Sequence, residues 1–316
     1  MNYLGIWPKS LMGTFMICAL LFHPLMHAQN TNKMDYTKLI DQWHNEREKD
    51  LKMPNGWLNL EGLFWLHKGV NSLGTAKGND CKYENLNSLD TSFPSQIGNF
   101  ILDGDSVLWE NLNSYQVKVN NVVLPLEKKI CVFNEKALNI EMTWSHYSWT
   151  IIKRAEKIGV RFRNLQSINV SSFKGIDRFP VNEQWKIKAV LHPPVQSELM
   201  ILNVLGQNLA TKNAGKLSFS YQNKEYNLDV IDEGAQTLFI TFADATSDVT
   251  TYGAGRFIDI AKPDANGNTE IDFNKAYNPP CAFTKFATCP LPPPQNRLPI
   301  AINAGEKIYG RHLSDH

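Results

Sequence analysis

The sequence predicts a mainly β protein that begins with one helix. Beyond residue 56, short apolar runs rich in Val, Ile, Phe and Trp alternate with turn residues at fairly regular intervals, which is typical of β-sandwiches and barrels. Before them, Leu39, Ile40 and Trp43 fall on one stripe of a charged segment, as in an amphipathic helix. We therefore expect an N-terminal helix, a small β-sandwich, and a second β-sandwich or barrel.

The first 28 residues have the pattern of a secretory signal. Lys9 is their only charge, an apolar run spans 11–22, and Ala28 supplies a small residue for cleavage. The run is too short, and too soon followed by Pro24, to span a membrane. We expect an exported chain, periplasmic or secreted, that is cleaved near Ala28 and has no membrane span when mature. An uncleaved signal anchor is the alternative.

The charge balance argues against nucleic acid as a partner. Removal of residues 1–28 would take away Lys9 and no acidic residue, so 31 basic residues would balance 31 acidic ones. Binding to polyphosphate backbones depends on an excess of Lys and Arg. No basic run is strong enough to overturn this prediction.

Turn residues divide the chain after the helix. The helix is expected over 29–52, because Pro54 and Gly56 follow directly. A composition change then separates a first β domain, 53–135, from a second one, 136–316. In the second domain, a two-residue turn at Asn266-Gly267 would pair Arg256 with Tyr277 across a hairpin.

Residues 276–297 form a proline-rich segment, called the strap below. It contains six prolines and two cysteines, so it is expected to be stiff and irregular rather than helical or an interior strand. In an exported chain a disulfide between Cys281 and Cys289 is the favoured pairing, although Cys81 and Cys131 allow others. A nucleophilic Cys281 or Cys289 is the alternative, and it requires a nearby base or cation.

Arg256 is the residue that most needs a partner. In the predicted hairpin it shares one face with Ile258, Ile260 and other apolar side chains. A buried charge without a partner is costly, so a carboxylate, a group of carbonyls or an anionic ligand should meet it.

Polar residues around the strap suggest a pocket for a small anionic or polar ligand, with Arg256 and Arg297 as charge partners. The same amides would also satisfy carbonyls of an irregular backbone, and both interpretations stay open. The predicted ligand-binding residues are Arg256, Asp272, Asn274, Asn278, Cys281, Cys289, Asn296, Arg297 and Glu306.

Two other classes of function remain as alternatives. A hydrolase-like enzyme would use Asp272 or Asp244 as acid or base, or Cys281 as nucleophile; a turn is the simpler interpretation of Asp244. A structural or interaction module needs none of these. The histidines lack metal-ligand spacing and the usual nucleotide and catalytic motifs are absent, so we predict no metal and no cofactor.

Four runs carry a resemblance to the bacterial and archaeal domain-of-unknown-function family 1684. They are GWLNLEGLFWLHKGVNSLG at 56–74, FPVNEQWKIKA at 179–189, FADATSDVTTYGAGRF at 242–257, and DFNKAYNPPCAFTKFATCPLPPPQNRLPIAINAGEK at 272–307. The family has no established activity. The resemblance implies that similar straps occur in proteins without export signals, which weakens the argument for a disulfide and strengthens that for a reactive or ligand-binding role of the cysteines.

The first β block is also similar to forkhead-associated sandwiches in its order of turns, GVNSLG, GND and VKVNNVVL. Those domains bind phosphothreonine through an arginine after the glycine. Thr75 stands at that position here, so the resemblance implies the scaffold alone.

Overall fold

The computed structural model describes residues 23–85, 92–112, 115–126, 128–136 and 138–310. Of these residues, 23–42 and 43–310 fall in separate compact units. Most of the predicted signal sequence, residues 1–22, lies outside the described residues. The predicted helix is present as α1, His23–Lys52, which begins earlier than expected and ends where Pro54 and Gly56 predicted. No helix in the part of the chain described is long and apolar enough to cross a bilayer.

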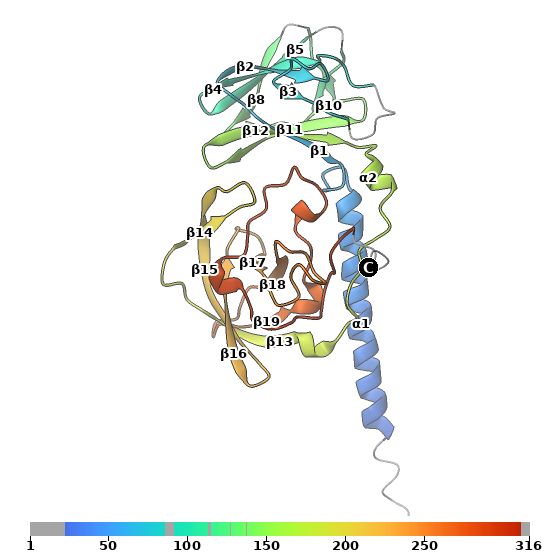
Figure 1. The fold of residues 1–316 in the computed structure, drawn as a ribbon, viewed down its shortest axis with the longest axis vertical. Helices are drawn as coiled ribbons and strands as arrows, with labels where there is room; N and C mark the ends of the chain where they lie inside the picture. Colours follow the sequence, from blue (N-terminus) through green and yellow to red (C-terminus); the bar gives the residue numbers. More distant parts are fainter. Residues whose placement is uncertain (1–22, 86–91, 113–114, 127, 137, 311–316) are drawn as a thin grey trace, which may run out of the picture. The chain divides into compact units, whose positions relative to one another are not determined.

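The strands after α1 form two six-stranded sheets that face each other (Figure 1). Trp109 from one sheet and Trp149 from the other are fully buried, with ring centroids 5.5 Å apart. Phe100 and Phe162 complete the centre of this core. In order across the first sheet the strands are β1 (Leu60–Trp65), β12 (Lys157–Asn164), β11 (Tyr147–Arg154), β10 (Met142–Trp144), β6 (Lys118–Val119) and β7 (Val122–Val123); across the second they are β3 (Cys81–Lys82), β2 (Gly69–Gly74), β4 (Gly98–Asp103), β5 (Ser106–Asn111), β8 (Lys129–Asn134) and β9 (Leu138–Asn139).

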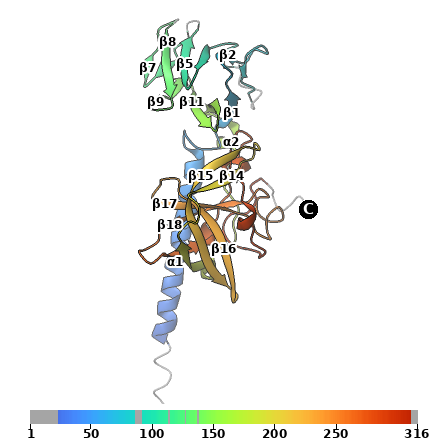
Figure 2. The same cartoon turned by 90° about the vertical axis from the view of Figure 1, so that its left-hand side faces the viewer.

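The remaining strands form one seven-stranded sheet that curls around a second core. Its end strands β18 and β19 contact each other, so the sheet is nearly closed. The order is β18 (Arg256–Ala261), β17 (Thr237–Phe242), β16 (Lys224–Ile231), β15 (Asn208–Tyr221), β13 (Lys186–His192) and β19 (Asn268–Asp272), and β14 (Glu198–Leu202) pairs with the first part of β15 (Figure 2). The mainly β fold with sandwich and barrel-like parts is confirmed.

Short helical segments connect and close these sheets. They are α2 (Ile168–Ser171) and the 3-10 turns η1 (Glu183–Trp185), η2 (Phe273–Lys275), η3 (Pro280–Ala282) and η4 (Pro294–Asn296). Two of them, η3 and η4, lie in the strap, which between 276 and 297 otherwise forms only single bridges. Proline at the start of each turn explains this, because its missing N–H is not needed there.

The sheets are grouped differently from the proposed boundary between residues 135 and 136. That boundary separates β8 from β9, which pair with each other. The strands β10, β11 and β12 follow it in sequence, yet β12 pairs with β1. The hydrogen bonding therefore changes from one β structure to the other after residue 164, between β12 and β13. Independent folding of the two parts stays a prediction.

The hairpin predicted at Asn266-Gly267 is wrong in its pairing. Instead of pairing with each other, β18 pairs with β17 and β19 pairs with β13. Asp264 closes the turn by accepting hydrogen bonds from the backbone N–H groups of Asn266 and Asn268. Tyr277 bridges to Phe257 and not to Arg256. The face assignment survives, because Arg256, Ile258 and Ile260 are all buried.

Candidate functional site: a cleft beside the strap

A cleft of about 530 Å³ lies beside the strap within residues 43–316. Four parts of the chain supply its walls: the end of α1, the strands β11 and β12, the strands β17 and β18 with the turn before β17, and the strap. The lining residues are Trp43, Glu46, Arg47, Asp50, Trp57, Arg154, Arg161, Glu233, Phe239, Phe257, Asp259, Tyr277, Pro280, Thr288, Cys289 and Pro290. The walls thus combine three arginines, four carboxylates and several aromatic rings.

Arg161 is the most unusual of these residues. Its Cζ atom lies 5.1 Å from the ring centroid of Trp57. Its Nε atom is buried and has no hydrogen-bond partner, and the guanidinium forms no ion pair with any described residue. Burial, together with the neighbouring charges of Arg154 and Arg163, lowers the pKa of Arg161 to about 10. The side chain is therefore charged at neutral pH but poorly compensated.

Arg154 lies on the same face of the sheet as Arg161. Thr150 is the register partner of Arg161, and Arg154 follows it by four residues, so the two arginines project to one side. The strap positions Arg154, because its Nε atom donates to the Thr288 hydroxyl at 3.2 Å. Its NH1 group donates to the carbonyl of Lys153 at 2.9 Å. The two arginines together make one wall of the cleft positively charged.

Two carboxylates of the neighbouring sheet, Asp259 and Glu233, also face the cleft. Asp259 accepts a hydrogen bond of 2.9 Å from the Tyr277 hydroxyl. Desolvation by the surrounding walls raises the pKa of Asp259. Desolvation also raises the pKa of Glu233, and the nearby charge of Asp259 raises it further. Both shifts favour the protonated form of the carboxyl group.

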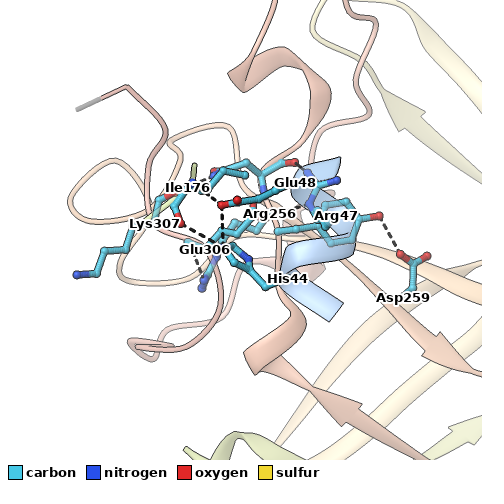
Figure 3. Close-up of polar contacts among 10 residues, drawn as sticks. His44, Arg47, Glu48, Ile176, Arg256, Asp259, Glu306 and Lys307 are labelled. Carbon is cyan, nitrogen blue, oxygen red and sulfur yellow. Dashed lines mark hydrogen bonds and ion pairs between the residues drawn. The ribbon is translucent and has the colours of Figure 1, made fainter. Parts of the chain in front are cut away.

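Arg47 on α1 fixes the strap where it enters the cleft (Figure 3). Its Nε atom donates to Glu306 at 2.9 Å and its NH2 group to the carbonyl of Asn278 at 2.8 Å. Glu306 in turn accepts from the backbone N–H of Asn278 at 2.6 Å. The guanidinium lies over the ring of Tyr277, with Cζ 4.3 Å from the centroid. Arg47 is thus fully engaged and orients Tyr277 towards Asp259.

Arg256 lies in the second core and not in the cleft. Its side chain is 1% exposed and its NH2 group contacts Asp244 at 2.7 Å, with the Asp244 side chain completely buried. The same guanidinium donates to the carbonyls of Ile302 and Ala304, while its Nε atom has no partner. The expectation that a carboxylate and carbonyls would meet Arg256 is confirmed. With these contacts made, no group of Arg256 faces a ligand in the cleft.

Most of the other predicted site residues also hold the backbone. Asn274 exchanges two hydrogen bonds of 2.9 Å with the backbone of Asn182, and Asp272 caps η2. Asn296 joins two strands by accepting from the N–H of Asp229 at 2.7 Å and donating to the carbonyl of Thr241. Arg297 is exposed. These positions fit the interpretation that polar side chains satisfy an irregular backbone.

The cysteine pair is reduced in the structure. Cys81, Cys131, Cys281 and Cys289 are all free, so the favoured disulfide is not formed. The backbone N–H of Cys281 donates to the Cys289 sulfur at 3.1 Å. A hydrogen bond from the Cys289 thiol lowers the pKa of Cys281, and the same interaction raises that of Cys289. Of the residues predicted to bind a ligand, only Cys289 lines the cleft.

The sequence contained a signal for the arginine that was missed. In the run KIGVRFRN, Arg161 and Arg163 alternate with Val160 and Phe162, which predicts arginines on the face opposite the core. Such a face is normally solvated. Nothing in the local pattern indicates that the strap covers this face. In the structure the strap does contact this sheet, where the Thr284 hydroxyl donates to the Leu60 carbonyl.

No group of three metal-ligating side chains occurs among the described residues.

Comparison with known proteins extends the description of the second β structure. The model of a family described as "Protein of unknown function (DUF1684)" matches residues 171–307. No curated protein matches the chain. The solution NMR structure of an uncharacterised protein from Haloarcula marismortui is 28% identical, with a TM-score of 0.38; the match covers 45% of this chain and 80% of that chain.

The matched segment begins at the last residue of α2 and ends ten residues beyond the strap. It includes the strands β13 to β19 and also three of the four runs that carried the resemblance. The run at 56–74 lies outside it. The resemblance is thus confirmed for the strap and the sheet around it, because residues 171–307 match the model of DUF1684, a family of proteins of unknown function.

Proposed function

We propose that the cleft binds a small anionic ligand through Arg161 and Arg154. The observation that carries the proposal is the guanidinium of Arg161, whose buried Nε atom has no acceptor. Burying an arginine without a counter-charge is unfavourable. A bound anion would remove this penalty, and the planar fork of a guanidinium fits a carboxylate or a phosphate with two parallel hydrogen bonds.

The neighbouring contacts support an anion at this position. Arg154 has two of its groups held by Thr288 and the Lys153 carbonyl, so its remaining NH2 group is oriented in advance. Pre-organised donors lose little conformational entropy when a ligand binds. The ring of Trp57 shields Arg161 from solvent on one side, and hydrogen bonds to a charged group strengthen where water is excluded.

Asp244 and Asp272 give little support to the hydrolase-like alternative. Asp244 is neutralised by Arg256, and its second oxygen accepts from the backbone N–H of Thr246 at 2.7 Å. Asp272 caps η2 and also accepts from the Asn274 amide. Both carboxylates therefore have structural tasks, whereas a general acid or base must be able to reach a substrate.

Export remains a proposal that rests on the sequence pattern of residues 1–28. Expression of the full chain in a bacterial host, followed by N-terminal sequencing of the periplasmic fraction, tests it directly. A mature N-terminus at Gln29 supports export. A chain that stays in the cytoplasm and still carries residues 1–28 contradicts it.

Isothermal titration calorimetry with inorganic phosphate and with hexanoate tests the anion site. We expect the wild type to bind at least one of these probes and Arg161→Gln to lose that binding. Arg297→Gln is the matched control, because Arg297 is exposed on the strap, and it should bind as the wild type does. Equal binding by wild type and Arg161→Gln, or no binding of either probe by wild type, would overturn the proposal.

A further inference from the structure

We infer that the ligand of the cleft is a dipolar ion, with an anionic group bound at Arg161 and an ammonium group bound at Asp259. This inference rests on the proposed function and adds the chemical class of the ligand. It follows from the charges, the aromatic rings and the polar contacts on the side of the cleft away from Arg161.

The cleft carries more negative than positive charge once internal pairs are removed. Its three arginines include Arg47, which is already paired with Glu306 outside the lining. Arg154 and Arg161 are left to balance Asp50, Glu233 and Asp259, three lining carboxylates that form no ion pair with any described residue. A simple anion would compensate the two arginines but would leave the acidic wall as it is. A molecule that also carries an ammonium group would compensate both walls.

Asp259 and Glu233 are the acids that an ammonium group would meet. Glu233 accepts no hydrogen bond from any described residue, and the Tyr277 hydroxyl donates to one oxygen of Asp259. The second oxygen of Asp259 therefore remains an acceptor in the cleft. The pKa of each carboxyl is raised, chiefly because the walls of the cleft desolvate it. A cation placed between them would stabilise their charged forms.

Aromatic rings line the cleft beside Asp259, where the Tyr277 hydroxyl donates to the carboxylate. Phe257 meets Tyr277 with centroids 5.8 Å apart, and Trp43 meets Tyr277 at 6.3 Å. Arg47 occupies one side of the Tyr277 ring, at 4.3 Å from its centroid. The rings of Trp43 and Phe257 line the cleft as well. Aromatic faces attract cations, and clusters of them beside a carboxylate bind ammonium groups.

A sugar acid, which has hydroxyl groups in place of the ammonium, is the nearest competing class. Hydroxyl groups also donate to carboxylates, but they are neutral and leave the excess negative charge uncompensated. The positive charges that lower the pKa values of Glu233 and Asp259 are those of Arg154 and Arg47, and both arginines are already held by other groups, which favours an ammonium.

The test is calorimetry on residues 29–316 with three matched series of probes. The first series is the ω-amino acids from glycine to 8-aminooctanoate. The second is the ω-hydroxy acids of the same lengths, and the third is the unsubstituted fatty acids. We expect one or two lengths of ω-amino acid to bind tenfold or more tightly than the fatty acid of that length, since a charge-assisted hydrogen bond contributes roughly 1.5–3 kcal/mol. Asp259→Asn should remove that advantage of the amino series over the fatty acids. Glu198→Gln, an exposed acid on β14, is the control.

The outcomes separate the two proposals. Equal affinities for the amino and unsubstituted series, with both lost in Arg161→Gln, would leave the anion site standing and overturn the dipolar ligand. A preference for the hydroxy series would also overturn it, in favour of a sugar acid. If no series binds, or if binding survives Arg161→Gln, the anion site itself is wrong. An amino-acid preference that persists in both Asp259→Asn and Glu233→Gln would contradict the assigned position of the ammonium.

Discussion

The buried pair of Asp244 and Arg256 gives the sharpest prediction about stability. The NH2 group of Arg256 lies 2.7 Å from the Asp244 carboxylate, and the two side chains are 1% and 0% exposed. Asp244→Asn would leave the guanidinium charge in the core with carbonyl partners alone. Because removing one partner of a buried pair leaves an uncompensated charge, we expect the free energy of unfolding to fall by about 3–5 kcal/mol.

Urea unfolding followed by tryptophan fluorescence measures this loss, with the midpoint and slope fitted together. For a chain of this size the loss corresponds to a decrease in melting temperature of roughly 6–20 °C. The double variant Asp244→Leu with Arg256→Met should recover most of the stability, since apolar residues of similar volume often replace buried pairs without loss. Asp232→Asn is the control, because its partner Lys212 is 71% exposed, and its effect should be much smaller.

A loss below about 1 kcal/mol in Asp244→Asn, the size seen for exposed pairs, would refute the reasoning. It would mean that solvent or a ligand reaches Arg256, as the sequence pattern first suggested. The structural role assigned to Arg256 would then have to be abandoned.

Three further predictions concern the cleft and the strap. Iodoacetamide should modify Cys281 faster than Cys289, as peptide mass spectrometry would show, because the hydrogen bond between them lowers the pKa of Cys281 and raises that of Cys289; resistance of both until reduction would indicate a disulfide. The pKa of Asp259 is raised in the folded chain, so its contribution to stability is present below the usual carboxyl pKa and is lost as the pH rises through the raised value. A plot of melting temperature against pH should therefore be flatter over that interval for Asp259→Asn than for the wild type. Thr288→Val removes the hydroxyl that orients Arg154 and should weaken phosphate or hexanoate binding severalfold, whereas Thr288→Ser should restore it.

The elements that depend on local pattern were predictable. The end of α1 at Lys52 follows from Pro54 and Gly56, and the buried face of β18 follows from alternation of Arg256 with its neighbours. The partner of Arg256 was not predictable, because Asp244 reaches it from the segment after β17 through the tertiary packing. The hairpin failed for a related reason: β18 and β19 each have a different neighbour available in the curled sheet.

The candidate cleft lies beside the strap, where the sequence placed a pocket, but apart from Cys289 it is lined by other residues than those predicted. The predicted residues, such as Asn274 and Arg297, were chosen because they lie near or within the strap in the sequence. The cleft instead depends on Arg154 and Arg161, which come from the first β structure and reach the strap only through the fold. A solvated arginine and a covered one have the same sequence signature. Only the covering segment distinguishes them.

The contacts of the strap explain why it is rich in proline. It must bridge two β structures: the Thr284 hydroxyl donates to Leu60 in the sandwich, and the backbone N–H of Leu291 donates to Leu202 in the curled sheet. A segment without regular structure would lose much conformational entropy when ordered in this way. Each proline restricts the unfolded chain, so less entropy is lost on folding. The strap can therefore present Tyr277, Thr288 and Cys289 as a fixed wall of the cleft, which is what a pre-organised binding site needs.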